Sequence, residues 1–162
     1  MNKRGENMKY VINGIFLTQK ITGVQRYGIE LLKALDNIEY ALDIEVLIPE
    51  YENTNIAFKR LKVIKYGKKS KKIWQQYDYM KYLIKNNAIG ICLSCPAPLF
   101  YNRKCIVVIH DMATCAHPEF YSKKYLLRNK IFMLNGVVKA KKILTVSEFS
   151  KLEIEKYLGI DK

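Results

Sequence analysis

The sequence predicts an α/β domain built around a mostly parallel sheet. Short β-branched segments alternate along the chain with longer segments whose apolar residues recur every three or four positions. The clearest strand is residues 105–109, Cys-Ile-Val-Val-Ile, and its apolar side chains at every position are typical of a parallel strand covered on both faces. With 162 residues, of which 49% are hydrophobic, the chain has enough apolar material for one core, which excludes disorder along its whole length.

Each expected strand is short, rich in β-branched residues and bounded by turn-forming residues, as where Pro49 ends the second one. Besides 105–109, the expected strands are residues 8–13, 44–48, 61–64, 89–93 and 143–146. Residues 1–7 precede a natural start at Met8, and we expect them to form a disordered extension to a domain over residues 8–162.

The helices are expected between the strands, over residues 23–36, 70–87, 122–141 and 147–158. In the second of these, one stripe should face the core; its members are Ile73, Tyr77, Met80 and Ile84. Ser147 caps the last helix, and Glu148 lies in the first turn, where the helix dipole favours a negative charge.

Charge is the unusual property of the composition. The chain has 28 Lys and Arg against 15 Asp and Glu, a net charge of +13. Such an excess favours polyanionic partners, which are nucleic acid, an anionic membrane or phosphorylated ligands. No apolar run approaches the ~20 residues of a membrane-spanning helix, and none follows the N-terminal charges as in a secretory signal.

The four cysteines indicate no metal site. Cys92 and Cys95 have Cys-x-x-Cys spacing, but a structural zinc site usually needs a second close pair. A thioredoxin-type redox pair precedes a helix, whereas Pro96 and Pro98 follow here. We therefore expect reduced, mostly buried thiols in a cytoplasmic protein, with a thiol redox protein as a third functional alternative.

Ligands of parallel sheets bind at the carboxyl ends of the strands, which directs attention to the loops after residues 13, 93, 109 and 146. In the first loop Gly23 begins a helix, where bare backbone N–H groups attract anions and Arg26 adds charge. Gly23, Val24, Gln25 and Arg26 are candidate substrate-binding residues. The segment is neither Gly-x-Gly-x-x-Gly nor a P-loop, and a lone glycine such as Gly23 is more often just an ordinary helix start.

His110 and Asp111 directly follow the strongest strand. A histidine in this position is well placed to bind a substrate hydroxyl or to move a proton, so His110 is the candidate catalytic residue and Asp111 a candidate substrate contact. The alternative is structural, with His110 bonded to neighbouring backbone and Asp111 capping the next turn. Ser147 and Glu148 are further candidates at the last loop, although a serine there is usually a helix cap.

A basic tract precedes several aromatic residues. Its cations are Lys59, Arg60, Lys62, Lys65, Lys68, Lys69, Lys71 and Lys72, and the rings that follow are Trp74, Tyr77, Tyr79 and Tyr82. Cations beside interfacial aromatics suit an anionic membrane surface, and the predicted contacts are Lys68, Lys69, Lys71, Lys72 and Trp74. A solvated face with inward aromatics and a single-stranded nucleic acid site are the alternatives.

Three segments taken together resemble the N-terminal domain of the family 4 glycosyltransferases, retaining enzymes of the GT-B fold often found in polysaccharide assembly. They are residues 12–18 with 22–27, residues 108–111 with 117–120, and residues 144–151, Leu-Thr-Val-Ser-Glu-Phe-Ser-Lys. The resemblance spans about residues 8–160. It implies a Rossmann-like three-layer domain that mainly binds the acceptor, while a C-terminal domain binds most of the nucleotide-sugar donor.

By this resemblance Gly23 and its neighbours face the donor phosphates, His110 lies beside the transferred sugar, and Ser147 borders the same cleft. It also implies a sugar or lipid-linked acceptor, no metal or other cofactor, and work at the inner face of the plasma membrane. Many relatives have Gly-Gly where this chain has Thr22-Gly23, and no pair of glutamates has the family's Glu-x7-Glu spacing.

The donor-binding domain is therefore expected to be absent, as in a truncated product, an isolated domain or half of a split enzyme. We expect this polypeptide alone to transfer no sugar at a useful rate. The alternative function is a non-catalytic basic module that binds nucleic acid or an anionic membrane; nucleic acid is disfavoured because the chain lacks the RNA-binding aromatic motif and zinc-finger spacing.

Overall fold

The computed structural model describes residues 9–39, 43–94, 96–101 and 105–160. The predicted extension at residues 1–7 and Cys95 of the Cys-x-x-Cys pair lie outside this range. The described chain forms two compact units, one ending at Ile91 and the other beginning at Cys92, and each is described by itself.

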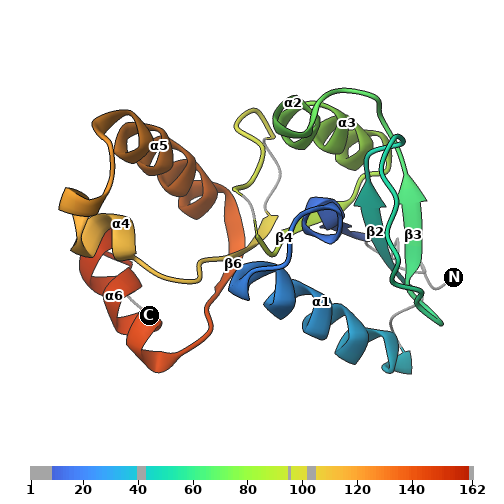
Figure 1. Ribbon diagram of the computed structural model, residues 1–162, viewed down its shortest axis with the longest axis horizontal. Helices are drawn as coiled ribbons and strands as arrows, with labels where there is room; N and C mark the ends of the chain where they lie inside the picture. The colour runs from blue at the N-terminus through green and yellow to red at the C-terminus, as the bar shows by residue number, and fades with distance from the viewer. Residues whose placement is uncertain (1–8, 40–42, 95, 102–104, 161–162) are drawn as a thin grey trace, which may run out of the picture. The chain divides into compact units, whose positions relative to one another are not determined.

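Strands and helices follow one another along the chain in the order shown in Figure 1. The strands are β1 (Tyr10–Asn13), β2 (Ile44–Ile48), β3 (Lys62–Lys65), β4 (Ile89–Cys92), β5 (Cys105–Val108) and β6 (Ala140–Leu144). The α-helices are α1 (Gly23–Asp36), α2 (Lys71–Gln76), α3 (Asp78–Lys85), α4 (Ala113–Ala116), α5 (Lys123–Lys139) and α6 (Glu148–Leu158). Two 3₁₀ turns, η1 (Gly14–Thr18) and η3 (Pro118–Phe120), add to these.

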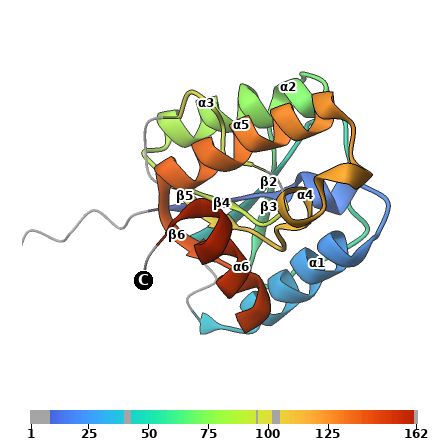
Figure 2. The ribbon, with the colours of Figure 1, turned by 90° about the vertical axis from the view of Figure 1, so that its left-hand side faces the viewer.

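The first unit is a parallel sheet between two helical layers. Its strands are hydrogen-bonded in the order β3-β2-β1-β4, and all three pairings are parallel. Helix α1 covers one face, and α2 with α3 covers the other (Figures 1 and 2). Val11, Ile12, Val46 and Leu47 are fully buried between these layers. The unit thus confirms the predicted α/β class with its Rossmann-like three-layer parallel arrangement.

The C-terminal turn of α1 is hydrogen-bonded through the side chain of Asp36 to the segment that precedes β3. The carboxylate of Asp36, in the last turn, accepts hydrogen bonds from the backbone N–H groups of Lys59, Arg60 and Leu61 at 2.7, 2.7 and 2.8 Å. Leu61 directly precedes β3. Asp36 therefore fixes the entry of the chain into that strand.

The second unit contains the parallel pair β5–β6, whose register shifts between Cys105 and Ile106. Helix α5 packs on one side of these strands and α6 lies on the other (Figures 1 and 2). Ser147 caps α6 as predicted: its Oγ accepts the N–H of Ser150 at 3.1 Å. The observed β6 begins and ends earlier than the expected strand at 143–146, and α4 and η3 occupy a stretch for which no element was predicted.

The predicted helix at 70–87 is wrong in two respects. It is divided at Tyr77 into α2 and α3, and the stripe expected to face the core faces outward. Ile73, Tyr77 and Ile84 are 55%, 48% and 53% exposed. The buried side chains instead are Trp74, Asp78, Tyr79, Tyr82 and Leu83. Both faces of this segment carry apolar residues, so the spacing of apolar residues alone could not show which face is buried.

No helix within the described residues is long and apolar enough to cross a membrane.

Candidate functional site

The first candidate loop connects β1 to α1. The side chain of Asn13, at the end of β1, accepts the N–H of Ile15 at 3.2 Å and so starts η1. Gln25 then closes the start of α1: its Oε1 accepts the N–H of Thr22 at 3.2 Å, and its Nε2 donates to Gln19 at 3.0 Å. Of the four candidates in this loop, Gln25 therefore has a clear structural role as a helix-capping residue.

Gly23 is exposed at the N-terminus of α1. A Cβ atom at this position would meet no described protein atom within 4 Å. Packing therefore does not require glycine here, and the backbone is open to a ligand that approaches it. Val24 is half-buried beside it, and the side chain of Arg26 is exposed.

His110 and Asp111 lie at the carboxyl end of β5, as predicted. The Nε2 atom of His110 lies 2.7 Å from the carbonyl oxygen of Leu93. Since a carbonyl can only accept, Nε2 carries the proton in this contact. Asp111 accepts the N–H of Ala113 at 3.0 Å and so caps the short helix α4. Both side chains thus have the structural roles that the sequence left open as their alternative.

Ser147 and Glu148 lie at the carboxyl end of β6. Besides capping α6, Ser147 donates its hydroxyl hydrogen to Ser150 Oγ at 3.0 Å. Glu148 is exposed, and Lys151 Nζ lies 3.6 Å from its carboxylate. The N–H of Ile109 donates to Leu144 O at 2.9 Å, which joins the chain after β5 to the end of β6. The structure therefore brings the His110 loop and the Ser147 loop to one edge of the second unit.

Three polar atoms that the sequence did not single out lie buried without a hydrogen-bond partner among the described residues. They are Asn13 Nδ2, Ser94 Oγ and Thr145 Oγ1. Each residue ends a parallel strand or follows within two residues of one, namely β1, β4 and β6. A buried polar group without a partner costs about 1–3 kcal/mol, so these atoms mark the strand ends as places where a polar ligand would be stabilising.

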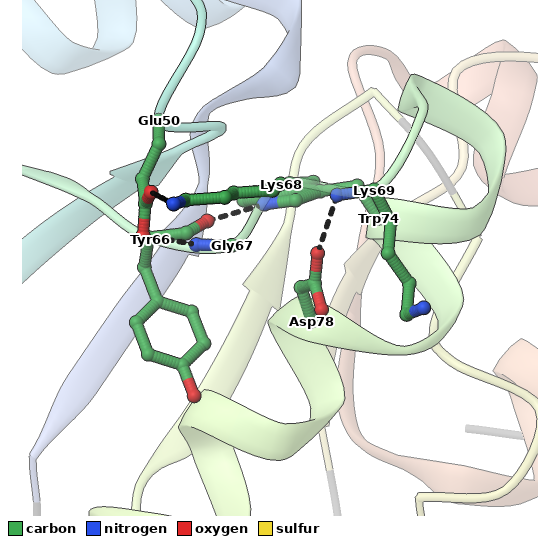
Figure 3. A network of polar contacts seen from close by, with 7 residues as sticks. All are labelled: Glu50, Tyr66, Gly67, Lys68, Lys69, Trp74 and Asp78. Carbon is green, nitrogen blue, oxygen red and sulfur yellow. Dashed lines mark hydrogen bonds and ion pairs between the residues drawn. The ribbon is translucent and has the colours of Figure 1, made fainter.

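The basic loop between β3 and α2 is held by a polar network (Figure 3). Trp74 Nε1 donates to Tyr66 O at 2.6 Å, Lys69 N–H donates to Asp78 at 3.0 Å, and Gly67 N–H donates to Glu50 at 3.2 Å. The backbone from Tyr66 to Lys69 is consequently fixed at three points. Gly67 has φ +80°, and a Cβ there would lie 2.5 Å from atoms of Asp78, so only glycine fits.

The residues predicted to contact a membrane differ in their exposure. Lys68, Lys69 and Lys72 are exposed, although Lys68 lies 3.9 Å from Glu50. Lys71 is half-buried, with Nζ 2.8 Å from Glu52 and 3.1 Å from Thr18 O. Trp74 corrects the prediction, because its side chain is 0% exposed and belongs to the core of the first unit.

Two side chains outside the candidate loops, Tyr82 and Asp36, have pKa values shifted from their ordinary values. Burial and then the hydrogen bond to Glu45, at 2.7 Å, raise the pKa of Tyr82 far above its ordinary value. Burial alone would raise the pKa of Asp36, but the three backbone donors outweigh burial and lower it. Both groups hold the fold together and show no sign of catalysis.

Within the described residues, no group of three or more His, Cys, Asp and Glu side chains is close enough to hold a metal ion. Cys92 and Cys105 are buried, and Cys115 is exposed. Comparison of the sequence with family models and curated proteins, and of the structure with solved structures, returned no match.

Proposed function

We propose that the chain is the acceptor-binding N-terminal domain of a retaining GT-B glycosyltransferase that moves a sugar from a nucleotide-sugar donor to a polysaccharide or glycolipid. One observation carries the proposal. The three segments on which the resemblance rests each follow a parallel strand, β1, β5 or β6, at its carboxyl end. Within each unit, these are the strand ends at which α/β sheets bind their ligands.

Each unit has features that support a ligand at the carboxyl ends of its own strands. The backbone at Gly23 is open, as an approaching phosphate of the donor would require, and the N-terminus of a helix favours an anion. The buried polar atoms of Asn13, Ser94 and Thr145 lack partners that a polyhydroxylated or phosphorylated substrate supplies. In this proposal His110 contacts a hydroxyl of the transferred sugar, and Ser147 and Glu148 border the cleft.

The proposal includes inactivity of the chain by itself. Holding both substrates in reacting geometry supplies about 7–11 kcal/mol of a reaction barrier, and the residues of a donor-binding domain are required for that. The partner is therefore a donor-binding domain or subunit. No metal or other cofactor is part of the proposed reaction, and the nucleotide-sugar acts as a substrate.

The test is acceptor binding by the full 162-residue chain on an array of polysaccharide and lipid-linked glycans. We expect selective binding of a glycan class, and His110→Ala should weaken it at least tenfold, because we propose that the acceptor hydroxyl meets the transferred sugar beside His110. His117→Ala is the matched control, because His117 is the second of only two histidines and is exposed beside Glu119. Absence of selective binding to any glycan, or sugar transfer by the pure chain alone, would refute the proposal in this form.

The net charge of +13 supports a second candidate function, that of a non-catalytic basic module that binds nucleic acid. A fluorescence titration with a single-stranded oligonucleotide distinguishes it. Submicromolar affinity near physiological salt, without glycan binding, would favour the module over the transferase domain.

A further inference from the structure

Helix α5 carries a line of apolar side chains that the second unit leaves exposed. These are Leu127, Ile131, Leu134 and Val138, which are 63%, 51%, 45% and 82% exposed. At 3.6 residues per turn, all four lie within about 60° of one another round the helix. We call these four residues the α5 seam.

The opposite side of α5 holds the helix on the second unit. Gly136 is buried there, and a Cβ atom at this position would lie 3.8 Å from the side chain of Val107 in β5. Asn129 Nδ2 donates to Thr114 Oγ1 at 2.8 Å. The helix therefore already has a face that packs on the unit, and the α5 seam is a second, unpartnered apolar face. An exposed apolar surface of this kind typically marks an interaction site.

The spacing of the α5 seam is that of a coiled coil. Its members follow one another at four, three and four residues, which is the alternation of the a and d positions of a heptad. A stripe confined to a and d is narrow and fits one facing helix, whereas a helix that lies on a wide apolar phase presents a broader stripe. The seam therefore favours a single helix as its partner.

The charges beside the α5 seam determine which helix fits. With Leu127 at d, the flanking g and e positions hold Lys123, Arg128 and Lys130, which are all exposed. Helix α5 contains no Asp or Glu, and among the described residues no carboxylate lies within 4.0 Å of these three cations. A second copy of the chain would place cation against cation in either orientation, whereas a helix with carboxylates at e and g would pair with them.

A cavity of about 380 Å³ opens beside the α5 seam. It lies between α5 and the end of α6, and its lining includes Leu126, Lys130, Met133, Leu134, Tyr157 and Leu158. Leu134 thus belongs to both the seam and the cavity. A partner could bury one apolar side chain here, as the anchors of protein interfaces do.

We propose that the α5 seam binds an acidic amphipathic helix of another protein. The apolar side chains of that helix pack against the seam, one of them enters the cavity beside Leu134, and its carboxylates lie beside Lys123, Arg128 and Lys130. The seam is about three turns long, so the contact is smaller than a standard protein interface and the complex is a reversible one. The proposal does not depend on the proposed glycosyltransferase function.

The experiment titrates the full chain into two fluorescently labelled synthetic helical peptides and follows their anisotropy. Both peptides have Ile at a and Leu at d; one has Glu at every e and g position, and the other has Lys. Repulsion between like charges keeps each peptide from pairing with itself. We expect saturable binding of the Glu peptide, weakened by salt, and no binding of the Lys peptide.

The contribution of charge is tested by Arg128→Glu with Lys130→Glu. This pair should weaken binding of the Glu peptide at least about tenfold and create binding of the Lys peptide, because each attraction becomes a repulsion. The matched control is Lys81→Glu with Lys85→Glu, which makes the same change of charge at exposed positions of α3. It should weaken binding less than about threefold, since it changes only the long-range field of the chain.

The apolar contribution is tested by Leu127→Ser with Ile131→Ser, which should weaken binding of the Glu peptide at least about tenfold. The matched control is Ile73→Ser with Ile84→Ser, at 55% and 53% exposed positions of α2 and α3, and it should leave binding unchanged. Circular dichroism checks that each variant remains folded, and the charge variants keep the test decisive where a serine variant does not fold.

Several outcomes overturn the proposal. These are equal binding of the two peptides, equal losses in the α5 and α3 charge variants, and no binding of the Glu peptide. Concentration-dependent self-association that is abolished by Leu127→Ser with Ile131→Ser would instead assign the α5 seam to a second copy of the chain. Partition into lipid vesicles that is lost in the same variant, without peptide binding, would assign it to a bilayer.

Discussion

Tyr79→Phe is expected to destabilise the first unit by about 2 kcal/mol. Tyr79 is fully buried on α3, and its hydroxyl lies between two strands. It donates to Val11 O of β1 at 2.8 Å and accepts Ile91 N–H of β4 at 3.1 Å. The hydroxyl thus satisfies one backbone group on each of two neighbouring strands.

The magnitude follows from those two groups. Phenylalanine fills the same volume, so packing is kept and only the polar contacts are lost. A buried backbone group left without a partner costs about 1–3 kcal/mol, and partial relaxation of the strand keeps the sum near the middle of that range. For a chain of this size that corresponds to a fall in Tm of about 4–8 °C.

Urea unfolding followed by circular dichroism measures the change. Tyr77→Phe is the matched control, because Tyr77 lies two residues away at the junction of α2 and α3 and is about half exposed. It should change the free energy of unfolding by less than about 0.5 kcal/mol. Equal stability of the two variants, with unchanged m-values, would refute the claim that the Tyr79 hydroxyl bridges β1 and β4.

Three further predictions concern other contacts described above. In urea unfolding, Gly67→Ala should destabilise the protein by more than about 2 kcal/mol, because φ is +80° and the added methyl group would overlap Asp78. Gly159→Ala is the control: φ there is +60°, but no described atom lies within 4 Å, so it should cost only about 1 kcal/mol. Similar costs for the two variants would argue against the clash with Asp78. Folding lowers the pKa of Asp36, so the ionised carboxylate stabilises the fold fully above the ordinary pKa of 3.8, and this stabilisation is lost as pH falls through the lower pKa of the folded state. The free energy of unfolding, measured against pH, should therefore fall below about pH 4. In Asp36→Asn this pH-dependent loss should be absent. Finally, iodoacetamide should modify Cys115 in the folded protein well before Cys92 and Cys105, as mapped by mass spectrometry; equal rates would contradict the burial of the latter two.

Local signals predicted much of the fold. The helix at 23–36 was predicted with its observed bounds, and Ser147 caps the last helix as expected, because caps depend on residues within one turn. The segment 70–87 failed because both of its faces are apolar. The face with Trp74 and Tyr79 is buried, and their polar atoms reach the carbonyls of Tyr66, just after β3, and of Val11 in β1. Sequence periodicity does not place these partners.

The sequence predicted which loops form the candidate site better than it predicted which side chains in them matter. The loops after β1, β5 and β6 follow from strand order alone, and the structure has them where a parallel sheet requires. The buried polar atoms of Asn13, Ser94 and Thr145 could not be found this way. An Asn, Ser or Thr at a strand end is typical of an ordinary turn, and only the three-dimensional packing around it shows that its polar atom lacks a partner.

The burial of Trp74 gives the protein a built-in optical reporter. It is the only tryptophan in the chain, it is shielded from water, and the ring of Tyr79 lies 6.0 Å away, close enough to transfer excitation to it. Its emission therefore follows the melting of the first unit and is blind to the second, whereas circular dichroism sees the helices of both. Superimposable curves from the two signals would show that the units melt together, and separated curves would resolve the stability of each half of the chain without labelling it.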